Sequence, residues 1–561
     1  MGGHTSRTRA LVAVVALVAF LGAVAAAHGA VLTEWKDGAR PPGYRLTAQQ
    51  AIAIGSRAAE LPGVRARYGR LTPHAFTYGH RRWQLDFRHN GVLRLEVHVD
   101  DRRARIAEVW TGTKLAWRGT RGSKALTDEG ETGPLTNATW LWVLLGVLFV
   151  APFVDPRRPL RMLHLDLALL LGLVVSHVAL DHARVEASLW LTLPVMVYLV
   201  IRFGRLAVRG ERDRSEPLVP FAPPWLLVAV FVALAVLKVV LNLTDSVAGD
   251  VAFAGVGGAD RISHGLDLYT AGGSQYDTYG PVNYLLYWPF ERIWPLQGPG
   301  DPNLWAAHAA SITFDLLTAV GLFVVGARVR AGHAGRLLGL ALAYAWIAYP
   351  FSWYALAWNT NDATVPMLLL PAVAALALPV MSGVFLGLAA AAKFVPALAG
   401  PLLVRQAMVR GGLRAGVGLA ATAALVAGAA VFFYLPDGGL REFYDATIGY
   451  QLGRSSPFSI WELHSSLQPV QTLLKVALGV ATVGGLLWSR PLSLARICAW
   501  LAALIVLLEM TLSYWNETYV VWFAPFALVA AFASWSTSVP RRGARPAQHR
   551  ETRLPAGSAR L

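Results

Sequence analysis

Long uncharged apolar runs fill most of the sequence from Trp140 onward and constrain the fold more than any other feature. The runs begin near Trp140, Leu163, Leu189, Trp225, Leu304, Leu337, Val365, Val417, Leu473, Ala499 and Val520. Several exceed the roughly 18 residues that a helix needs to cross a membrane. Only 15% of the 561 residues are charged, against about 25% in a soluble domain. The sequence therefore predicts a polytopic α-helical membrane protein with about 11–13 membrane helices.

Basic residues gather in the short turns between these runs. They lie at Arg157 and Arg158, in 202–214, 328–336, 405–414 and 490–496, and in the tail after Arg541. Cytoplasmic loops of membrane proteins carry an excess of Lys and Arg, so we expect these turns in the cytoplasm. The polar segments between them are then extracytoplasmic. The formal net charge of +16 follows from this topology and does not indicate nucleic-acid binding.

The apolar segment 383–403 does not fit a simple alternation of spans. It follows the run from Val365 with almost no turn and leads into Arg405. Placing both of its ends in the cytoplasm implies a re-entrant pair of half-helices, broken near Lys393 and Pro396. The alternative is a full span, which puts the basic turn after it outside. Lys393 is a functional candidate as an intramembrane charge, but in the cytoplasmic half snorkelling or pairing is as good an explanation.

The first 137 residues differ in composition from the membrane region. An apolar run within residues 1–30 follows Arg7 and Arg9, which is typical of a cleaved signal peptide or a retained signal anchor. Residues 31–137 are polar and predict a small extracytoplasmic α+β domain. The tail 538–561 is basic, and we expect it to be cytoplasmic and disordered.

Local patterns support the small domain. Thr47 and Gln50 form a capping-box signature that opens a helix. Two alternating runs joined by Asn90 and Gly91 predict a β-hairpin, and a third strand follows Asp101. This order of helix and strands resembles a PepSY-type domain, which implies a binding or regulatory module. The single cysteine, Cys498, excludes an intrachain disulfide framework.

A polar insert, 244–303, concentrates charge directly after an apolar run. Its charged residues are Asp245, Asp250, Asp260, Arg261, His264, Asp267 and Asp277. Carboxylates at a membrane interface are costly unless they have partners or a task. The insert therefore predicts a reaction site that faces the lipid headgroups. A second outer loop is expected at 435–468.

Four segments carry a family resemblance. They read GDVAFAGVGGADRISHGLDLY, DTYGPVNYLLYWPFE, TIGYQLGRSSPFSIWEL and YWNETYVVWFAPF, and begin at Gly249, Asp277, Thr447 and Tyr514. Over residues 224–535 the chain resembles the GT-C superfamily of membrane glycosyltransferases, and within it the family 87 type, the polyprenol-phosphate-mannose-dependent mannosyltransferases. The resemblance implies a catalytic membrane core over 223–537. The small domain and the membrane helices of 138–222 are additions to the usual core.

The resemblance implies a hexosyltransferase that moves a sugar, with mannose favoured, from a polyprenyl-phosphate donor to an extracytoplasmic acceptor hydroxyl. No cofactor or metal is expected. A carboxylate beside the hydroxyl acts as general base. Asp250 is the first candidate because it lies about one helical turn beyond the apolar run, where the superfamily's first-loop acid falls. Asp245 is the second, and for either residue a helix cap is the alternative interpretation.

Further residues are candidates for donor and acceptor binding. A departing phosphate favours cations, and Arg261, His264 and Arg454 are the candidates. A salt-bridged surface helix is the alternative for the first two. The candidates for sugar or acceptor contacts are Asp260, Asp277, Tyr279, Asn361, Asp362, Trp515 and Glu517. For the aromatic residues an interfacial belt is the competing explanation.

Two other classes of protein remain open. A transporter or flippase for lipid-linked sugars would show two matched broken helices, whereas the sequence has one broken segment and no internal repeat. A membrane-anchored PepSY-type sensor would leave the acidic insert without a role. The expected partners of the enzyme are the bilayer, the lipid-linked donor and a glycolipid, glycan or protein acceptor. We expect a multi-pass protein of the cell membrane with its site outside.

Overall fold

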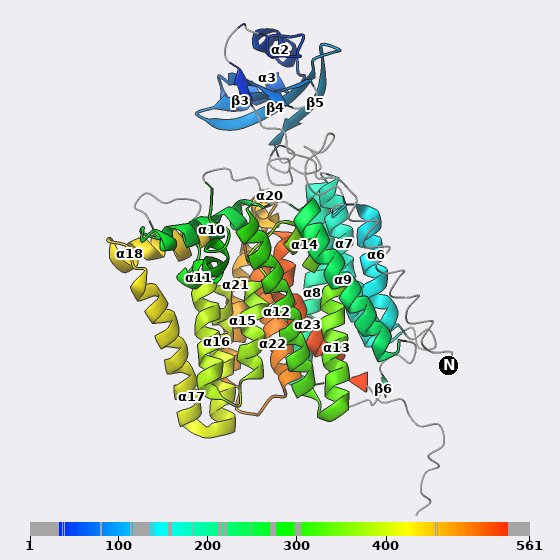
Figure 1. The fold of residues 1–561 in the computed structure, drawn as a ribbon, viewed down its shortest axis with the longest axis vertical. Coiled ribbons are helices and arrows are strands. Elements are labelled where there is room, and N and C mark those ends of the chain that lie inside the picture. Colours follow the sequence, from blue (N-terminus) through cyan, green and yellow to red (C-terminus); the bar gives the residue numbers. More distant parts are fainter. Residues whose placement is uncertain are drawn as a thin grey trace, which may run out of the picture.

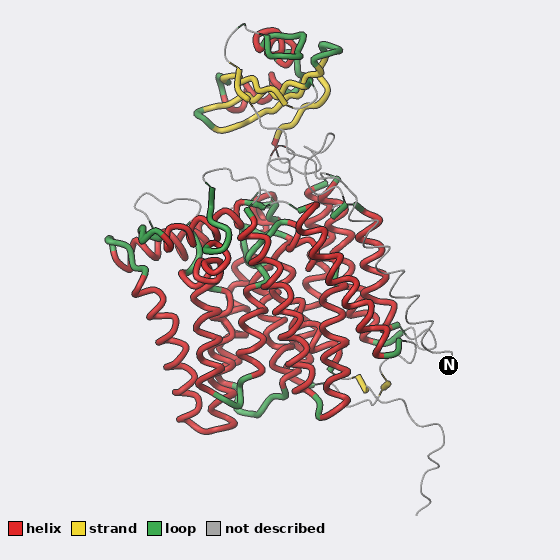
Figure 2. The backbone as a smooth tube through the Cα atoms, viewed as in Figure 1, coloured by secondary structure: helices red, strands yellow, loops and turns green. Residues whose placement is uncertain are grey.

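The structure is a computed structural model that joins a helical bundle to a small unit with a β-sheet (Figures 1 and 2). It describes residues 33–35, 38, 40–78, 81–112, 115, 135–136, 138–154, 160–182, 184–210, 216–217, 222–246, 248–269, 277–297, 304–454, 456, 458–533 and 535–536. Six of the described helices are long and apolar enough to cross a membrane. The predicted fold class, a polytopic helical membrane protein with a small N-terminal α+β unit, is confirmed. The expected leader in 1–30 and the tail 538–561 lie outside the described residues.

The N-terminal unit is an antiparallel sheet covered by two helices. Its strands are β1 (Thr33–Trp35), β2 (Thr72–Tyr78), β3 (Arg82–His89), β4 (Val92–Asp100) and β5 (Arg105–Thr111), in that order across the sheet, and its helices are α2 (Ala48–Gly55) and α3 (Leu61–Tyr68). Alternate residues of β3, Trp83, Leu85 and Phe87, are fully buried, because side chains alternate between the two faces of a strand.

Local predictions for this unit hold in part. The capping box is present, since Thr47 and Gln50 bond each other's backbone N–H groups. The β3–β4 hairpin turns at Asn90 and Gly91, which both have positive φ. The predicted helix ends early, at Gly55, and a second helix begins at Leu61. β1, β2 and α3 were not predicted, because they are short and their sequences lack clear periodicity.

Each predicted apolar run falls on a helix of the bundle. These helices are α6 (Thr139–Val150), α7 (Met162–Asp181), α8 (Val185–Arg209), α9 (Pro224–Asp245), α12 (Trp305–Val329), α13 (Gly332–Ala348), α15 (Thr364–Ala374), α17 (Gly400–Phe433), α21 (Gln468–Leu487), α22 (Leu494–Glu509) and α23 (Val520–Phe532). A short 3-10 turn, η2 (Ala151–Phe153), follows α6, and two short strands, β6 (Glu216–Pro217) and β7 (Trp535–Ser536), pair in parallel.

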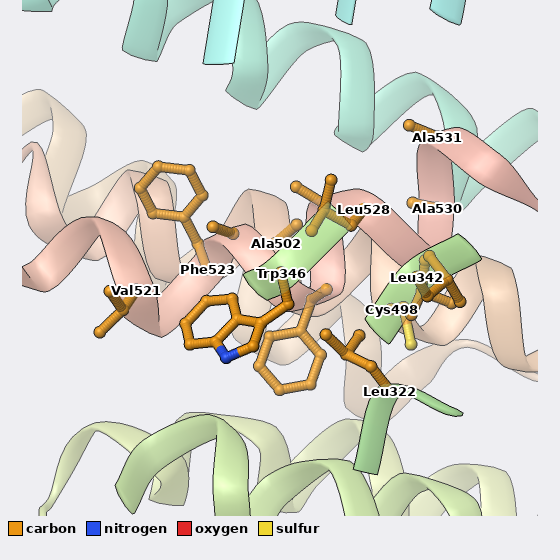
Figure 3. Close-up of a cluster of buried hydrophobic side chains, with 14 of the residues drawn as sticks. Leu322, Leu342, Trp346, Cys498, Ala502, Val521, Phe523, Leu528, Ala530 and Ala531 are labelled. Atoms are coloured by element: carbon orange, nitrogen blue, oxygen red, sulfur yellow. The ribbon is translucent and has the colours of Figure 1, made fainter. Parts of the chain in front are cut away.

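The core of the bundle lies around α23, of which every residue is buried. Figure 3 shows Trp346 of α13, Cys498 of α22, and Phe523 and Leu528 of α23 in this cluster. A helix that is apolar on all sides is stable only when it is surrounded, here by other helices. By contrast, in the apolar stretches of the helical segments Val395–Phe433 and Ser465–Leu487, which include α17 and α21, only 11% of the residues are buried. These two helices therefore form an edge of the bundle that faces lipid.

The segment after α15 enters the bundle and returns. α16 (Pro379–Ala392) ends at Lys393, whose backbone is extended, and the 3-10 helix η3 (Val395–Ala399) leads into α17. The first part of α17 runs to Gly412, where a φ of +76° breaks the helix. Arg410 and Gln406, near that break, bond the turn between α21 and α22. Both ends of the segment thus lie at one end of the bundle, as the re-entrant interpretation predicts.

One part of that interpretation is wrong, because Lys393 does not lie toward the basic turns. The fourteen residues of α16 rise about 21 Å from the basic end and carry Lys393 to outer-loop residues Tyr279 and Tyr519. Close packing of α16 against α17 agrees with this path of the chain. A Cβ on Gly383 or Gly387 would lie 2.5–2.6 Å from backbone oxygens of α17, so small residues are needed at this spacing.

Short helices cover the end of the bundle that lies opposite the basic turns (Figure 1). The polar insert forms α10 (Asp250–Ser263) and α11 (Pro281–Glu291), and α14 (Pro350–Ala357) precedes α15. The segment 435–468, predicted above as the second outer loop, forms α18 (Gly439–Tyr444), a π-helical turn (Asp445–Gly449), α19 (Tyr450–Gly453), α20 (Ile460–Leu463) and the 3-10 turn η5 (Ser465–Leu467). A further 3-10 turn, η6 (Glu517–Tyr519), joins α22 to α23.

Candidate active site

A cavity of about 740 Å³ lies where the outer loops meet the broken segment. Its polar lining comes from Asp250, Thr278, Tyr279, Thr360, Asn361, Asp362, Lys393, Gln451, Arg454, Lys475, Ser513, Tyr514, Asn516 and Thr518. Its apolar lining includes Val395, Leu398, Ile448, Leu452, Leu478, Leu508 and Leu512. The apolar part belongs largely to η3, α19, α21 and α22, so one side of the cavity is polar and the other is aliphatic.

Asp250 is the first residue of α10 and reaches the cavity from the polar insert. Its carboxylate accepts a hydrogen bond from the N–H of Val251, 2.9 Å away. A negative charge is favoured at a helix N-terminus. The backbone N–H of Gly249 bonds the carbonyl of Trp358, which fixes the start of the helix. Asp250 is exposed and forms no ion pair within the described part of the chain, so its second oxygen is available.

Lys393 and Asp362 form a buried ion pair in the cavity wall. The indole N–H of Trp522 donates to the same Asp362 oxygen over 2.9 Å, and the Lys393 ammonium lies 5.0 Å from the Trp522 ring centre. A buried carboxylate with these partners is neutralised in place and makes a poor proton acceptor. The pair therefore shapes the cavity and leaves its net charge unchanged.

Two cations in the cavity have no carboxylate partner in the described ranges. The Arg454 guanidinium stacks 3.6 Å from the Tyr514 ring centre and bonds Gln451. Lys475 projects from α21 and is exposed. With Asp362 and Lys393 paired, the remaining charges of the cavity are one carboxylate, Asp250, and these two cations. The cavity thus carries a net positive charge suited to an anionic group.

Two tyrosine hydroxyls complete the polar wall. Burial raises the pKa of Tyr279 well above its ordinary value, and burial also raises the pKa of Tyr514. Both hydroxyls consequently stay protonated and are able to donate hydrogen bonds. Gln451 donates to the carbonyl of Thr278 over 3.2 Å, which ties the second outer loop to the first.

Gly280 fixes the position of Tyr279. A Cβ at residue 280 would lie 2.0 Å from the carbonyl oxygen of Ala391, so only glycine fits. This contact places the N-terminus of α11 directly against the last turn of α16. It explains how Thr278 and Tyr279 come to lie beside Lys393.

Seven predicted site residues do not line the cavity. Asp245 accepts hydrogen bonds from the backbone N–H groups of Leu135 and Thr136, at 3.0 and 2.7 Å, and caps the chain before α6. Such a carboxylate is fully used in a structural role, so the geometry favours Asp250 over Asp245 as a base. Asp260, Arg261, His264, Asp277, Trp515 and Glu517 are the other six.

Four of these residues, Asp260, Arg261, His264 and Asp277, form contacts within the polar insert. Arg261 bonds the carbonyl of Leu268 and lies 3.9 Å from Asp277, which is buried. His264 bonds Asp260 one turn earlier on the same helix. The salt-bridged helix, given above as the alternative for Arg261 and His264, describes this arrangement.

Trp515 and Glu517 lie in the turn between α22 and α23, which borders the cavity, but their side chains point away from the cavity. The Trp515 indole bonds Glu509 over 3.3 Å, and Glu517 bonds His177 of α7. Their neighbours Tyr514 and Asn516 line the cavity instead. The turn is nearly extended at Asn516, where successive side chains point to opposite sides. The sequence pointed to all four residues of this turn, Tyr514 to Glu517, but did not separate the two that line the cavity from the two that do not.

Several lining residues were not predicted. Lys475 is the most informative, because a lone Lys in an apolar run is itself a signal of function. Gln451, Tyr519 and Trp522 stand beside predicted positions and carried no separate signal. Lys393 was singled out by the same intramembrane rule, but its partner Asp362 lies 31 residues earlier and was not assigned to it.

The fold and this cavity describe a polytopic membrane protein with a charged pocket at one end of its bundle. The family comparison makes this more specific. Residues 278–554, a little under half of the chain, match the family described as Glycosyltransferase family 87. The match indicates a membrane glycosyltransferase. It begins at Thr278, so it covers Tyr279, Lys393 and Arg454 but not Asp250. No curated protein and no solved structure matches the chain.

Proposed function

We propose that the protein transfers a sugar, with mannose favoured by the resemblance, from a polyprenyl phosphate to an acceptor hydroxyl outside the cytoplasm. The observation that carries this proposal is the charge arrangement of the cavity. Among the described residues, Asp250 has no ion-pair partner, and it shares one cavity with Arg454 and Lys475, two cations that have no carboxylate partner there. Proton removal needs the carboxylate, and a leaving phosphate needs the cations.

The proposed reaction is a single displacement. Asp250 takes the proton of the acceptor hydroxyl as its oxygen forms a bond to the anomeric carbon. The bond from that carbon to the phosphate oxygen breaks at the same time, and the polyprenyl phosphate leaves with the electron pair. Arg454 and Lys475 hold the phosphate, and Tyr279 and Tyr514 are placed to donate hydrogen bonds. A single displacement inverts the anomeric configuration.

The aliphatic side of the cavity supports a lipid-linked donor. It is built by η3 and α21, and α21 belongs to the edge of the bundle that faces lipid. An isoprenoid chain would lie along Leu398 and Leu478 with its phosphate near Lys475. Lys side chains commonly place their ammonium at the headgroup level while their stem stays in lipid.

The distribution of basic residues supports an extracytoplasmic site. Arg328, Arg410 and Arg496 bond backbone carbonyls at the end of the bundle opposite the cavity. An excess of Arg marks the cytoplasmic side. Under this proposal the N-terminal unit within 31–137 is also outside, 138–222 supplies additional helices, and 223–537 forms the catalytic core.

The transporter alternative is supported less well. Alternating access needs two matched broken helices around a site at the membrane midplane. Among the described helices the break at Lys393 lies at the cavity, whereas the break at Gly412 lies at the opposite, basic end of the bundle, so the two are not a matched pair around one site. A sensor would have no use for a carboxylate opposed to two cations in the membrane region.

The test is the substitution Asp250→Asn, assayed with labelled polyprenyl-phosphate mannose in membranes that hold equal amounts of inserted protein. Loss of a general base should lower the transfer rate by about 10²–10⁴-fold. Asp267→Asn is the matched control, because Asp267 is an exposed carboxylate of the same insert and does not line the cavity. Transfer by Asp250→Asn within a few-fold of wild type would remove this residue from the mechanism.

A further inference from the structure

The helices upstream of the family match reach the cavity wall from behind. His177 of α7 and Glu517 of η6 are each about 1% exposed, and the imidazole Nδ1 bonds the carboxylate. Glu517 stands between Asn516 and Thr518, which both line the cavity. A residue 340 positions earlier in the chain is therefore attached directly to the turn that forms one wall of the site.

The His177 ring is itself held on several sides. It stacks on Trp142 of α6 with ring centres 3.9 Å apart and meets the edge of Tyr354 at 4.7 Å. Its other nitrogen lies 3.6 Å from Asp181. The Trp142 indole donates to the carbonyl of Thr136. Because these neighbours hold the His177 ring in one orientation, its Nδ1 already faces Glu517 and the side chain loses no further conformational freedom when it bonds the carboxylate.

The turn depends on this attachment at its C-terminal end. Its first part is fixed by Gln471, which donates to the carbonyl of Thr511 and the hydroxyl of Ser513. Beyond that, Asn516 accepts a hydrogen bond from the N–H of Thr518, a contact within the turn itself. Removing the partner of a buried carboxylate such as Glu517 is costly, so the turn would have to move to rehydrate it.

We propose that His177 is a positioning residue of the site, acting through Glu517 to hold residues 513–519 in place. The added helices α6 and α7 are then part of the working enzyme. The physical part of this proposal needs no assumption about the reaction. Its catalytic part rests on the proposed function.

The physical part is tested by hydrogen exchange and mass spectrometry on the full-length protein in lipid nanodiscs, without substrate. His177→Ala should speed exchange in peptides spanning 513–519 by at least about ten-fold, since a local opening is made easier. His182→Ala, which changes an exposed histidine at the C-cap of the same helix, should leave the exchange of these peptides unchanged. Glu517→Gln removes the charge from the other partner of the His177–Glu517 contact. It should also speed exchange in peptides spanning 513–519, while the amides of α7 stay protected. If neither His177→Ala nor Glu517→Gln changed the exchange of peptides spanning 513–519, the proposal would be overturned.

The catalytic part is tested with the transfer assay. His177→Ala should lower kcat/KM by about 10–100-fold, because small displacements of a site are costly to the rate. The double variant with Glu517→Ala should fall no more than about three-fold below the worse single variant, since both changes break one contact. Losses that multiply, or an unchanged rate in a variant whose turn exchanges faster, would show that the contact does not position the site. An inactive wild type would refute the proposed function alone.

Discussion

At the scale of single residues, the partners of a carboxylate decide what it is able to do. Asp245, Asp250 and Asp362 all lie near the outer ends of apolar helices. Asp245 is occupied by two backbone N–H groups, and Asp362 by Lys393 and Trp522. Only Asp250 keeps an oxygen toward the cavity without a protein partner in the described residues.

Arg454 and Lys475, which have no carboxylate partner among the described residues, should contribute unequally to donor binding. Arg454→Ala should raise the KM for the donor by about 10–100-fold, since a partly buried charged hydrogen bond is lost. Lys475→Ala should raise it only a few-fold, because exposed ion pairs are weak. Both are measured by donor titration in membranes. Arg441→Ala, at an exposed position of the same outer loop, is the control. An unchanged donor KM for Arg454→Ala would exclude this residue from phosphate binding.

Sequence reasoning found the segments that build the cavity more reliably than the residues that face it. Asp250, Tyr279, Asn361, Asp362 and Arg454 line the cavity as predicted candidates. Asp277 and Glu517 come from the same segments but point elsewhere. Orientation within a loop depends on partners that are distant in sequence, such as His177 for Glu517. A single sequence contains no record of those contacts.

At the scale of elements, the charge rule located an unusual backbone course. The basic residues that follow 383–403 favoured a segment that returns to the side it entered from, and it does so at Lys393. The rule did not give the depth of the break, which depends on the length of α16. Apolar runs were found throughout because each is long and uncharged. β1, β2 and α3 were missed because short elements owe their structure to tertiary packing.

The contact between the polar insert and α16 should tolerate no side chain. Gly280→Val should lower transfer more than ten-fold and reduce thermal stability, because its Cβ would overlap the Ala391 carbonyl. Unfolding is followed by the temperature at which detergent-extracted protein aggregates. Gly257→Ala is the control, since a Cβ there meets nothing within 4 Å and alanine favours a helix. Full activity of Gly280→Val would contradict the close approach.

At the scale of the whole molecule, charge separates the two ends of the bundle. The cavity and the outer loops lie at one end, and Arg side chains gather at the other. The sequence predicted this asymmetry from its turns alone, since orientation depends on the composition of loops and not on packing. The arrangement of helices within the bundle required the structure.

A matched pair of cysteines tests this orientation. Ser466 and Ser489 are exposed and flank the two ends of α21. In intact cells an impermeant maleimide should label Ser466→Cys, whereas Ser489→Cys should be labelled only after permeabilisation. Cys498 is fully buried and gives no background. The reverse pattern would place the cavity in the cytoplasm and exclude an extracytoplasmic acceptor.

The exposed edge formed by α17 and α21 has a practical consequence. Because these helices bury so little of themselves in protein, the bilayer supplies most of their packing partners. Detergent micelles differ from a bilayer in thickness and lateral pressure, so extraction should loosen this edge before it affects α23. An assay in detergent would then report a cavity missing part of its aliphatic wall, and activity should return when the protein is reconstituted into acyl chains of native length.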